Sequence, residues 1–513
     1  MNFYTTEQIK QIERNTMSLG MNSLRMMENA GSAVARVIRD RFGVGLKSVI
    51  ICGRGNNGGN GFVVARKLKE NGGDITVIQA LGEPATHDAM EMLSRLYPLG
   101  VRVLNYDDNY AAAEDCINEA DIVIDAIFGN GFHDMPYQNS LSRLISTANN
   151  TAAKKIAIDM PSGANPDTGE VMTGVCIKCD MTIGIIGLKP GYVMYPAGTF
   201  CGELYSVEIG LPDGAANNIV PIMSSIDEGY IRSVLSVRPR HCHKGDFGRA
   251  AIVAGSLGMC GASVLAARAA LYSGAGLVHM IVPDCNYTAA TIAVPEAVIA
   301  PLDTNEKGGI SQKESAKLAR VIDRADSCLI GPGMGAGFHT QKLVETVLAC
   351  CNCPIIIDAD GINSIAACIN IIRGSKSNVI LTPHPGEMAR LCGVDVKDVE
   401  QNRLQISKDF AIKYGCILVL KGSVTIVALP NGTCFVNLGG NGGMASAGCG
   451  DMLAGMLAAL LAEGMAPEAA ARAAVYLHAE AGDFAISETS MRSLTPTMMI
   501  DALPSMFKKY ETG

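Results

Sequence analysis

The chain contains no tryptophan, and aromatic residues make up only 5% of its 513 residues. It also has no excess of basic residues, because 42 Lys and Arg face 50 Asp and Glu, for a formal net charge of −8. Nucleic-acid-binding and membrane-surface proteins carry basic patches, so the charge balance argues against both classes. Gly or charged residues interrupt every apolar run before it is long enough to cross a membrane. The amino-terminal stretch MNFYTTEQIKQIERN lacks the apolar core of a secretory signal.

The 17 cysteines are an odd number scattered through a long chain. This usage does not indicate a disulfide framework, and we expect reduced thiols in a cytoplasmic protein. Two local groups, Cys176 with Cys179 and Cys350, Cys351 with Cys353, have no second ligand pair at zinc-finger spacing. We therefore interpret them as ordinary thiols and not as metal sites.

Short apolar runs that end in Gly or Asp and lead into helical patterns recur in both halves of the chain. Such runs are typical of buried parallel strands whose following loops carry function. A chain of this length predicts at least two domains, and the turn-rich stretch 211–240 is the best boundary. We therefore predict two α/β domains, residues 1–215 and 239–513, joined by a linker at 216–238. The runs lie at 47–53, 74–80, 120–129, 154–163, 250–256, 327–333, 354–360 and 417–423.

The stretch GRGNNGGNG (53–61) follows the first predicted strand of this kind. It satisfies G-x-G-x-x-G, but the acid expected about twenty residues later in a dinucleotide fold is missing, since Asp74 precedes a strand. Asn56 and Asn57 can both donate and accept hydrogen bonds, so the loop could hold a polar ligand and a monovalent cation. A plain strand–helix turn is the alternative, and five glycines in nine residues make it the weaker interpretation.

Two further polar loops follow strands in the same half. Asp125 precedes FGNGFHDM, and Asp159 and Ser162 lie in IDMPSGANPDTG. In a parallel sheet these loops meet at one edge, where the carboxylates could bind a cation or move a proton. Each carboxylate taken alone could equally be a strand-end cap.

Taken together, GRGNNGGNG, DAIFGNGF, AIDMPSGANPDTG and IGLKPGY resemble the epimerase domain of the YjeF N-terminal family, over about residues 1–215. The resemblance implies a Rossmann-like three-layer α/β/α fold that binds hydrated NAD(P)H, with Asp159 catalytic. It implies K⁺ ligands Asn57, Asp125 and Ser162. This chain has Asn60 where the family usually has Asp. An amide cannot act as a carboxylate base, so the epimerase is impaired if that acid is essential, whereas Asn substitutes well if the residue only caps the helix. The implied substrate contacts are Asn56, Asn57, Gly58, Gly59, Asn60, Gly129, Asn130, Gly131, Phe132, His133, Asp134, Met135 and Asp159.

In the second half, NGGMASAGCGDMLAG (441–455) places one carboxylate, Asp451, behind a run of small residues. Apolar residues after Gly450 recur at helical spacing, so Asp451 is expected in the first turn of a buried helix. The N–H groups of Gly448, Cys449 and Gly450 would then be unpaired and form an anion hole for phosphate. A carboxylate beside that hole can accept a hydroxyl proton during phosphoryl transfer. An Asp that only favours the helix dipole would not explain the preceding glycines.

Two other stretches of this half suggest a site. His384 lies between two prolines in LTPHPGEMARL, which fixes its backbone and favours a positioned role over that of a surface histidine. KGSVTIVALPNGTCFVN (421–437) predicts a strand end followed by a hairpin through Pro-Asn-Gly.

With HKGDFGRAAIVAGS and GPGMG, these motifs resemble the ADP/ATP-dependent NAD(P)H-hydrate dehydratases, which are ribokinase-like α/β/α kinases in fold, over about residues 230–505. The resemblance implies Asp451 as the base, with Mg²⁺ accompanying ADP or ATP. Cys449 stands where Ser or Thr is usual. The implied contacts to the hydrate are Ala262, Gly333, His384 and Asp451, and those to the nucleotide are Lys421, Gly422, Ser423, Val424, Thr425 and Gly450.

The two resemblances together imply a bifunctional enzyme that interconverts the R and S hydrates of NADH and NADPH and dehydrates the S form, giving AMP and phosphate from ADP. The expected partners are these small molecules and further copies of the chain, with no nucleic acid and no membrane. Two alternatives are a small-molecule kinase of the ribokinase type with a degenerate first domain, and a non-catalytic nucleotide sensor.

Overall fold

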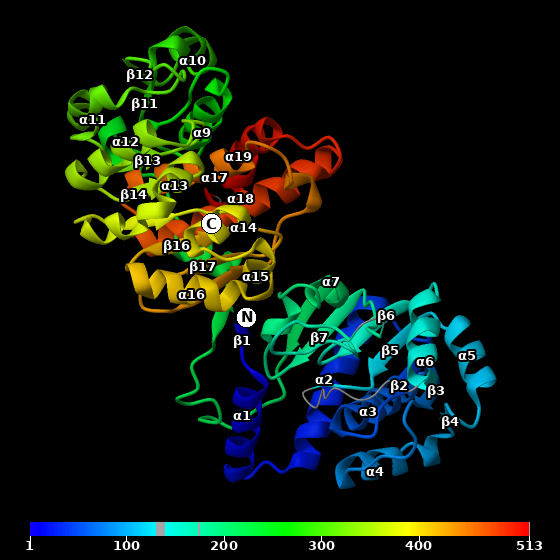
Figure 1. Ribbon diagram of the computed structural model, residues 1–513. Helices are drawn as coiled ribbons and strands as arrows, with labels where there is room; N and C mark the ends of the chain where they lie inside the picture. Colours follow the sequence, from blue (N-terminus) through cyan, green and yellow to red (C-terminus); the bar gives the residue numbers. More distant parts are fainter. Residues whose placement is uncertain (130–138, 173–174, 512–513) are drawn as a thin grey trace. The chain divides into compact units, whose positions relative to one another are not determined.

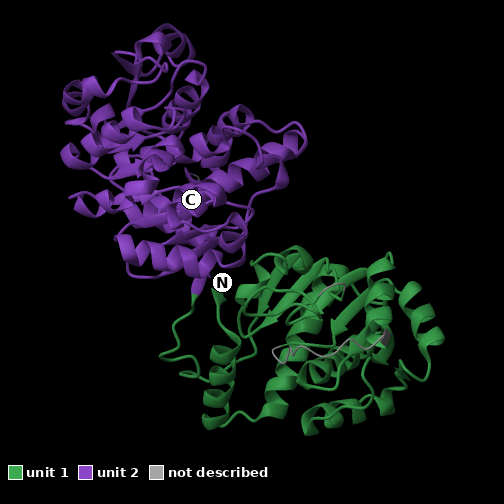
Figure 2. Cartoon of the chain, viewed as in Figure 1, with its two compact units in different colours: residues 1–222 green, residues 223–513 purple. Residues whose placement is uncertain are grey.

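The computed structural model of the chain describes residues 1–129, 139–172 and 175–511. Its contacts divide it into two units, Met1–Ile222 and Met223–Gly513, and each combines a sheet with helices on both sides (Figure 2). Residues 216–238, expected as a linker, hold β9 (Met223–Ser225) and α8 (Glu228–Val234) of the second unit. Within the described ranges, no helix has the length and apolar character needed to span a membrane.

The sheet of the first unit has seven strands, all parallel, in the order β4-β3-β2-β5-β6-β7-β8 (Figure 1). The order reverses between β2 and β5, so the loops after these two strands diverge and leave a crevice at their carboxyl ends. The strands are β2 (Lys47–Cys52), β3 (Asp74–Gln79), β4 (Arg102–Asn105), β5 (Ile122–Ala126), β6 (Lys154–Ile158), β7 (Met181–Ile185) and β8 (Glu203–Val207).

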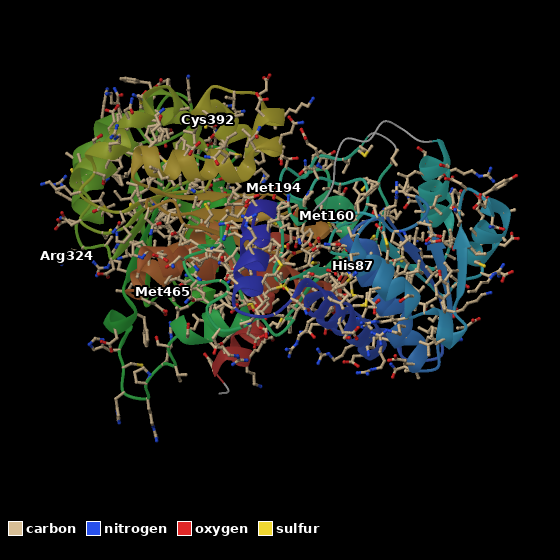
Figure 3. The ribbon with its side chains drawn as sticks, turned by 90° about the horizontal axis from the view of Figure 1, so that it is seen from below. His87, Met160, Met194, Arg324, Cys392 and Met465 are labelled. Atoms are coloured by element: carbon tan, nitrogen blue, oxygen red, sulfur yellow. The ribbon has the colours of Figure 1, made fainter. Side chains whose placement is uncertain are left out.

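Two hydrophobic cores lie on the two faces of this sheet. One packs side chains of α2, α3 and α4 against the strands, and the other packs side chains of α5 and α6. Side chains fill the interior between the layers; Met160, labelled in Figure 3, is buried, whereas His87 at the start of α4 is exposed. The remaining elements are β1 (Asn2–Phe3), α1 (Thr6–Ser18), α2 (Ser23–Phe42), α3 (Asn56–Glu70), α4 (His87–Ser94), α5 (Tyr110–Asn118), α6 (Asn139–Asn150) and α7 (Gly198–Cys201).

The second unit has a larger mixed sheet in the order β9-β18-β17-β16-β15-β14-β13-β10-β11-β12. The strands from β12 to β16 pair in parallel, and the predicted hairpin is confirmed by antiparallel pairing of β17 with β18. The strands are β10 (Arg249–Val253), β11 (Leu277–Pro283), β12 (Val298–Leu302), β13 (Ser327–Ile330), β14 (Ile355–Ile357), β15 (Val379–Leu381), β16 (Ile417–Leu420), β17 (Thr425–Ala428) and β18 (Cys434–Asn437).

Helices α9, α17, α18 and α19 build the main core of this unit on one face of the sheet. Helix α11 contacts β12, α12 contacts β14, and α16 contacts β16. The helices are α9 (Cys260–Tyr272), α10 (Tyr287–Ala293), α11 (Ser315–Ile322), α12 (Phe338–Cys350), α13 (Asp360–Ile365), α14 (Pro385–Cys392), α15 (Val396–Gln401), α16 (Arg403–Tyr414), α17 (Cys449–Ala462), α18 (Pro467–Glu488) and α19 (Pro496–Glu511).

Helix α17 approaches α9 closely because Gly455 has no side chain. A Cβ atom built at Gly455 would lie 2.1 Å from the carbonyl oxygen of Ala266. We expect Gly455→Ala to lower the free energy of unfolding of the second unit by about 1–3 kcal/mol, since backbone must move to admit the methyl group.

Urea unfolding of Gly455→Ala measures this loss. Gly374→Ala is the matched control, because a Cβ atom at Gly374 would meet nothing within 4 Å. Equal stability of the two variants would contradict the close packing.

Candidate active sites

The crevice of the first unit is a cavity of about 600 Å³. Residues that follow β2, β5 and β6 line it, together with residues of α1. This is the edge of the sheet at which the sequence predicts the polar loops to meet. The described polar lining residues are Lys10, Glu13, Arg54, Asn56, Asn57, Asn60, Thr86 and Asp159.

Asn57, Asp125 and Ser162 come together beside the Phe128 peptide. The Asn57 amide donates hydrogen bonds to the carbonyl oxygens of Phe128 (2.7 Å) and Ile158 (3.0 Å). Asp125 accepts from the Ser162 hydroxyl (2.6 Å) and N–H (2.7 Å), and the Ser162 hydroxyl also accepts from the Phe128 N–H. Burial raises the pKa of the Asp125 carboxyl to about 6, although its bonds to Ser162 oppose the shift. The cluster gathers oxygen atoms around one buried carboxyl group.

Asp159 lines the cavity from the end of β6 in a left-handed backbone conformation, with φ of 72°. Lys189, which is fully buried, forms an ion pair with its carboxylate, and the Tyr192 hydroxyl donates to its carbonyl oxygen. A buried Lys needs such a partner, because an unpaired charge in the interior is costly. Asp159 therefore carries a fixed ion pair at the cavity wall.

The glycines after β2 lie in a helix where the sequence predicts a loop. Asn56 begins α3, so Gly58, Gly59 and Gly61 are helical residues and not loop residues. A Cβ atom at Gly58 would lie 2.0 Å from the Gly53 carbonyl oxygen, and one at Gly59 would meet Met27 of α2. These glycines allow α3 to pack against its strand and α2, and this packing places Asn56, Asn57 and Asn60 at the cavity.

Gly129 is the last described residue of its loop. A Cβ atom at Gly129 would lie 3.0 Å from an Asp159 carboxylate oxygen and 3.1 Å from the Asn57 amide carbon. Gly129 therefore lines the cavity between these two side chains. The other predicted contacts of this loop, Asn130, Gly131, Phe132, His133, Asp134 and Met135, lie outside the described residues.

The sequence analysis did not identify three charged residues that line this cavity, Lys10, Glu13 and Arg54, nor the buried Lys189 that pairs with Asp159. Lys10 and Glu13 come from α1, which precedes every recognised motif, and Lys189 pairs with Asp159 from 30 positions away. Lys189 lies inside the motif IGLKPGY, which the sequence analysis identified, but the sequence does not indicate that Lys189 pairs with Asp159.

In the second unit, Asp451 lies in the first turn of α17, as predicted. Gly448 caps the helix in the left-handed region, with φ of 97°. The expectation of three free N–H groups is wrong at one position, because the Cys449 N–H donates to the Ser446 carbonyl oxygen (3.4 Å). The Cys449 thiol is buried against Ser446 and Met499, so it faces the core. Burial, and then the charge of Asp358, raise the pKa of Asp451 to about 7.

Lys421 follows β16 and forms an ion pair with a second carboxylate of this edge. Its ammonium bonds to Asp358 at the end of β14 (2.7 Å), and Thr382 donates to the same oxygen (2.7 Å). The other Asp358 oxygen is buried with no hydrogen-bond partner among the described residues. A Cβ atom at Gly450 would lie 3.1 Å from the Lys421 nitrogen, so the missing side chain leaves the ammonium over the start of α17. A fixed cation and a helix N-terminus there suit a phosphate group.

His384 is also placed at this edge. It caps α14, its Nδ1 accepts from the Gly386 N–H (3.0 Å), and the buried Glu387 accepts from the His384 N–H (2.8 Å). Burial, and then the Lys421 charge, lower the pKa of His384, which favours a neutral imidazole. The rigid turn predicted from the two prolines is therefore a capping box.

Residues 421–424 form the turn between β16 and β17, and Thr425 is the first residue of β17. Buried Arg403 of α16 donates to the carbonyl oxygens of Leu420, Lys421 and Val424, and Gly422 packs against its guanidinium. Ser423 is exposed, and the Thr425 hydroxyl donates to the Gly422 carbonyl (3.3 Å). Arg403 thus fixes the backbone of the turn, while Ser423 remains exposed to solvent.

Ala262 and Gly333 lie side by side. A Cβ atom at Gly333 would be 2.9 Å from that of Ala262, and the Ser256 hydroxyl donates to the Gly333 carbonyl. Leu265, one turn after Ala262 on α9, would meet a Cβ atom at Gly448. The structure thus places this pair near the beginning of α17.

Four residues of this edge escaped sequence analysis: Asp358, Glu387, Arg403 and His478. Asp358 lies within the run PIIIDAD (354–360), whose pattern predicts only a strand. His478 of α18 makes a backbone hydrogen bond with Cys449, and burial lowers its pKa to about 4.

No group of three or more His, Cys, Asp or Glu suited to a metal ion occurs among the described residues, and this includes the two cysteine groups.

Comparison with known proteins gives consistent matches over both units. Residues 23–191 match the family model described as YjeF-related protein N-terminus, and residues 250–505 match the model of NAD(P)H-hydrate dehydratase. The chain is 34% identical to the bifunctional NAD(P)H-hydrate repair enzyme Nnr of Moorella thermoacetica, over 100% of this chain and 97% of that protein. It is 33% identical to the enzyme of the same name from Escherichia coli, over 97% and 92%.

A solved structure resembles the second unit. The ADP/ATP-dependent NAD(P)H-hydrate dehydratase of Bacillus subtilis, co-crystallised with ATP and Mg²⁺, is 31% identical, with a TM-score of 0.50. The match covers 56% of this chain and 99% of that one. A ribokinase-like superfamily protein of Enterococcus faecalis is 30% identical with the same TM-score, over 58% and 99%.

The Lys421–Asp358 pair generates a stability prediction. Lys421→Met leaves the buried Asp358 carboxylate without its cation, and we expect a loss of about 3 kcal/mol in the unfolding free energy of the second unit. The double variant Lys421→Met/Asp358→Asn removes both charges and should recover part of that loss.

Urea unfolding of both variants and of Asp358→Asn measures the coupling. Additive losses in the double variant would show that the two side chains do not interact.

Proposed function

The chain belongs to the family of bifunctional NAD(P)H-hydrate repair enzymes, and from this premise we propose how its two units divide the work. The first unit interconverts the R and S hydrates of NADH and NADPH. The second unit dehydrates the S hydrate at the expense of ADP or ATP. The observation that carries the proposal is the placement of Asp451, with its raised pKa, in the first turn of α17 beside the Lys421 ammonium.

In the second unit, Asp451 accepts the proton of the hydrate's hydroxyl while that oxygen attacks the terminal phosphorus of ADP or ATP. The phosphoryl group is held by Lys421 and by the free N–H groups of the α17 N-terminus, which offset the charge that develops on it. The ring nitrogen's lone pair then expels phosphate, and loss of a proton from the neighbouring carbon restores the dihydropyridine. Phosphorylation is needed because hydroxide is a poor leaving group.

The predicted contacts keep their roles in this proposal. Ala262, Gly333 and His384 border the hydrate, and residues 421–425 with Gly450 border the nucleotide. Mg²⁺ accompanies the nucleotide and would neutralise phosphate charge; it usually takes only one or two carboxylates and otherwise phosphate and water. Asp358, which has an unpartnered oxygen, and Asp360 are the carboxylates that would serve it.

In the first unit, the oxygen cluster of Asn57, Asp125 and Ser162 fits a K⁺ ion. Hard cations prefer oxygen ligands, and the carbonyl groups of Phe128 and Ile158 add to the set. A cation there would also favour the charged form of Asp125, which burial opposes. The cavity beside it, bounded by Asn56, Asn60, Gly129 and Asp159, is the proposed site of the hydrate.

All 17 cysteines are free, which suits a protein of the cytoplasm, and we propose this location. A homo-oligomeric state is also part of the proposal.

Asp451→Asn tests the dehydratase. With S hydrate and ADP, the wild-type chain should restore the near-ultraviolet absorbance of the dihydronicotinamide ring and release phosphate. The variant should lose about 10²–10⁴-fold in kcat because the base is gone, while nucleotide still raises its Tm. For the wild type, kcat/KM should rise with pH through about 7, since only the ionised Asp451 accepts a proton.

Asp323→Asn, an exposed change on the same unit, is the control and should behave as wild type. Wild-type turnover in Asp451→Asn would reject Asp451 as the base. A phosphorylated hydrate that persists would indicate a kinase, and absence of turnover in the wild type would indicate a nucleotide sensor.

Replacing choline chloride with KCl tests the cation site. A bound K⁺ stabilises only the folded first unit, and each kcal/mol of binding should raise its Tm by about 2–4 °C. Asp125→Asn should lose this K⁺-specific rise, whereas Asp74→Asn, exposed at the start of β3, should keep it. Equal Tm values in the two salts would refute a K⁺ site.

A further inference from the structure

We propose that Glu13 of α1 is a second proton-transfer residue of the first unit, acting on the hydrate together with Asp159. This inference rests on the proposed epimerase function and adds a catalytic residue to it. Glu13 lies outside all the motifs that identify the family and outside the matched residues 23–191.

The helix α1 holds Glu13 at the cavity. Ile9, Ile12 and Thr16 are almost fully buried and fix one face of α1 against the unit. Glu13 follows Ile9 by four residues and so projects from the edge of that face. It lines the main cavity and also an adjoining cavity of about 160 Å³, and Asn56 and Asn60 border both.

The carboxyl group of Glu13 has no structural partner. It forms no hydrogen bond or ion pair with any residue in the described ranges, whereas Glu7 on the same helix pairs with Arg14 at the surface. A half-buried carboxyl group that stabilises nothing in the fold is available to a ligand.

The environments of Glu13 and Asp159 favour opposite protonation states, as a general acid and a general base require. Burial, and then the charge of Asp159, raise the pKa of Glu13, so it holds a proton more readily. Asp159 is ion-paired with Lys189, which suits a carboxylate. Two carboxyl groups in contrasting surroundings can act as acid and base in one reaction. The other charged groups near Glu13 are Lys10, Arg14 and Lys189, with Arg54 lining the main cavity and Asp88 the adjoining one.

Epimerisation at the hydroxyl-bearing carbon needs both functions. The C–O bond breaks as the hydroxyl takes a proton from Glu13 and leaves as water, while the ring nitrogen's lone pair forms a C=N bond. Water then adds to the other face of that carbon and gives a proton to Asp159. Proton exchange with solvent returns Glu13 to its acid form and Asp159 to its carboxylate, so atoms, electrons and protons balance over the cycle. Asn60 cannot exchange a proton in this way. Among the described lining residues, only Lys10, Glu13 and Asp159 have side chains suited to it.

Glu13→Gln is the test, with Glu7→Gln on the exposed face of α1 as its matched control. Epimer exchange of the R hydrate is measured without ADP, above the enzyme-free rate, and dehydration of the S hydrate with ADP is measured on the same samples. We expect Glu13→Gln to lose about 10²-fold or more in kcat for exchange with little change in KM. Its Tm and its dehydration of the S hydrate should equal those of the wild type and of Glu7→Gln.

The pH profile separates proton transfer from a structural role. The wild-type exchange rate should fall as pH rises past the pKa of Glu13, because the protonated acid is lost. Glu13→Gln should lack this fall, and Glu13→Asp should restore part of the rate. Wild-type exchange in Glu13→Gln, or a change in KM alone, would overturn the assignment. Failure of the wild-type chain to exchange epimers would instead overturn the epimerase function itself.

Discussion

Parallel pairing of buried strands is the constraint on which both units depend. Because parallel strands all point the same way, the residues that follow them meet at one edge of the sheet. In the first unit this brings Asn57, Gly129 and Asp159 to one cavity, from the segments that follow β2, β5 and β6. In the second it brings Asp358, His384 and Lys421 together from β14, β15 and β16. Each site is therefore built from residues far apart in the sequence, on a rigid support.

Both sites also contain a buried Lys–Asp ion pair at the carboxyl end of the sheet, Lys189 with Asp159 and Lys421 with Asp358. The second pair illustrates why such an arrangement is kept at a site and not used for stability alone. A buried pair is a weak source of stability compared with apolar packing. It does, however, hold an ammonium group at a fixed place over the α17 N-terminus, and it keeps a negative charge close enough to raise the pKa of Asp451.

Asp451 itself was predictable, because the small residues before it and the apolar stripe after it identify a helix N-terminus. The role of its neighbours was not. The Cys449 N–H is used by the Ser446 carbonyl, and the glycines after β2 serve close packing of α3 instead of a loop. Both facts depend on which atoms approach one another. A high number of glycines in the sequence indicates only that the backbone is approached closely at some point, and not by which atoms.

Local sequence patterns were enough to predict the α/β class, the positions of the main strands, the family and the residues carried by its motifs. Strands of this kind and their polar ends are encoded within a few neighbouring positions. Three contacts became visible only in the folded chain: Lys189 pairs with Asp159, Lys421 pairs with Asp358, and Glu13 reaches the cavity from the first helix. These contacts join residues separated by 30, 63 and more positions, and no local pattern records a partner that distant.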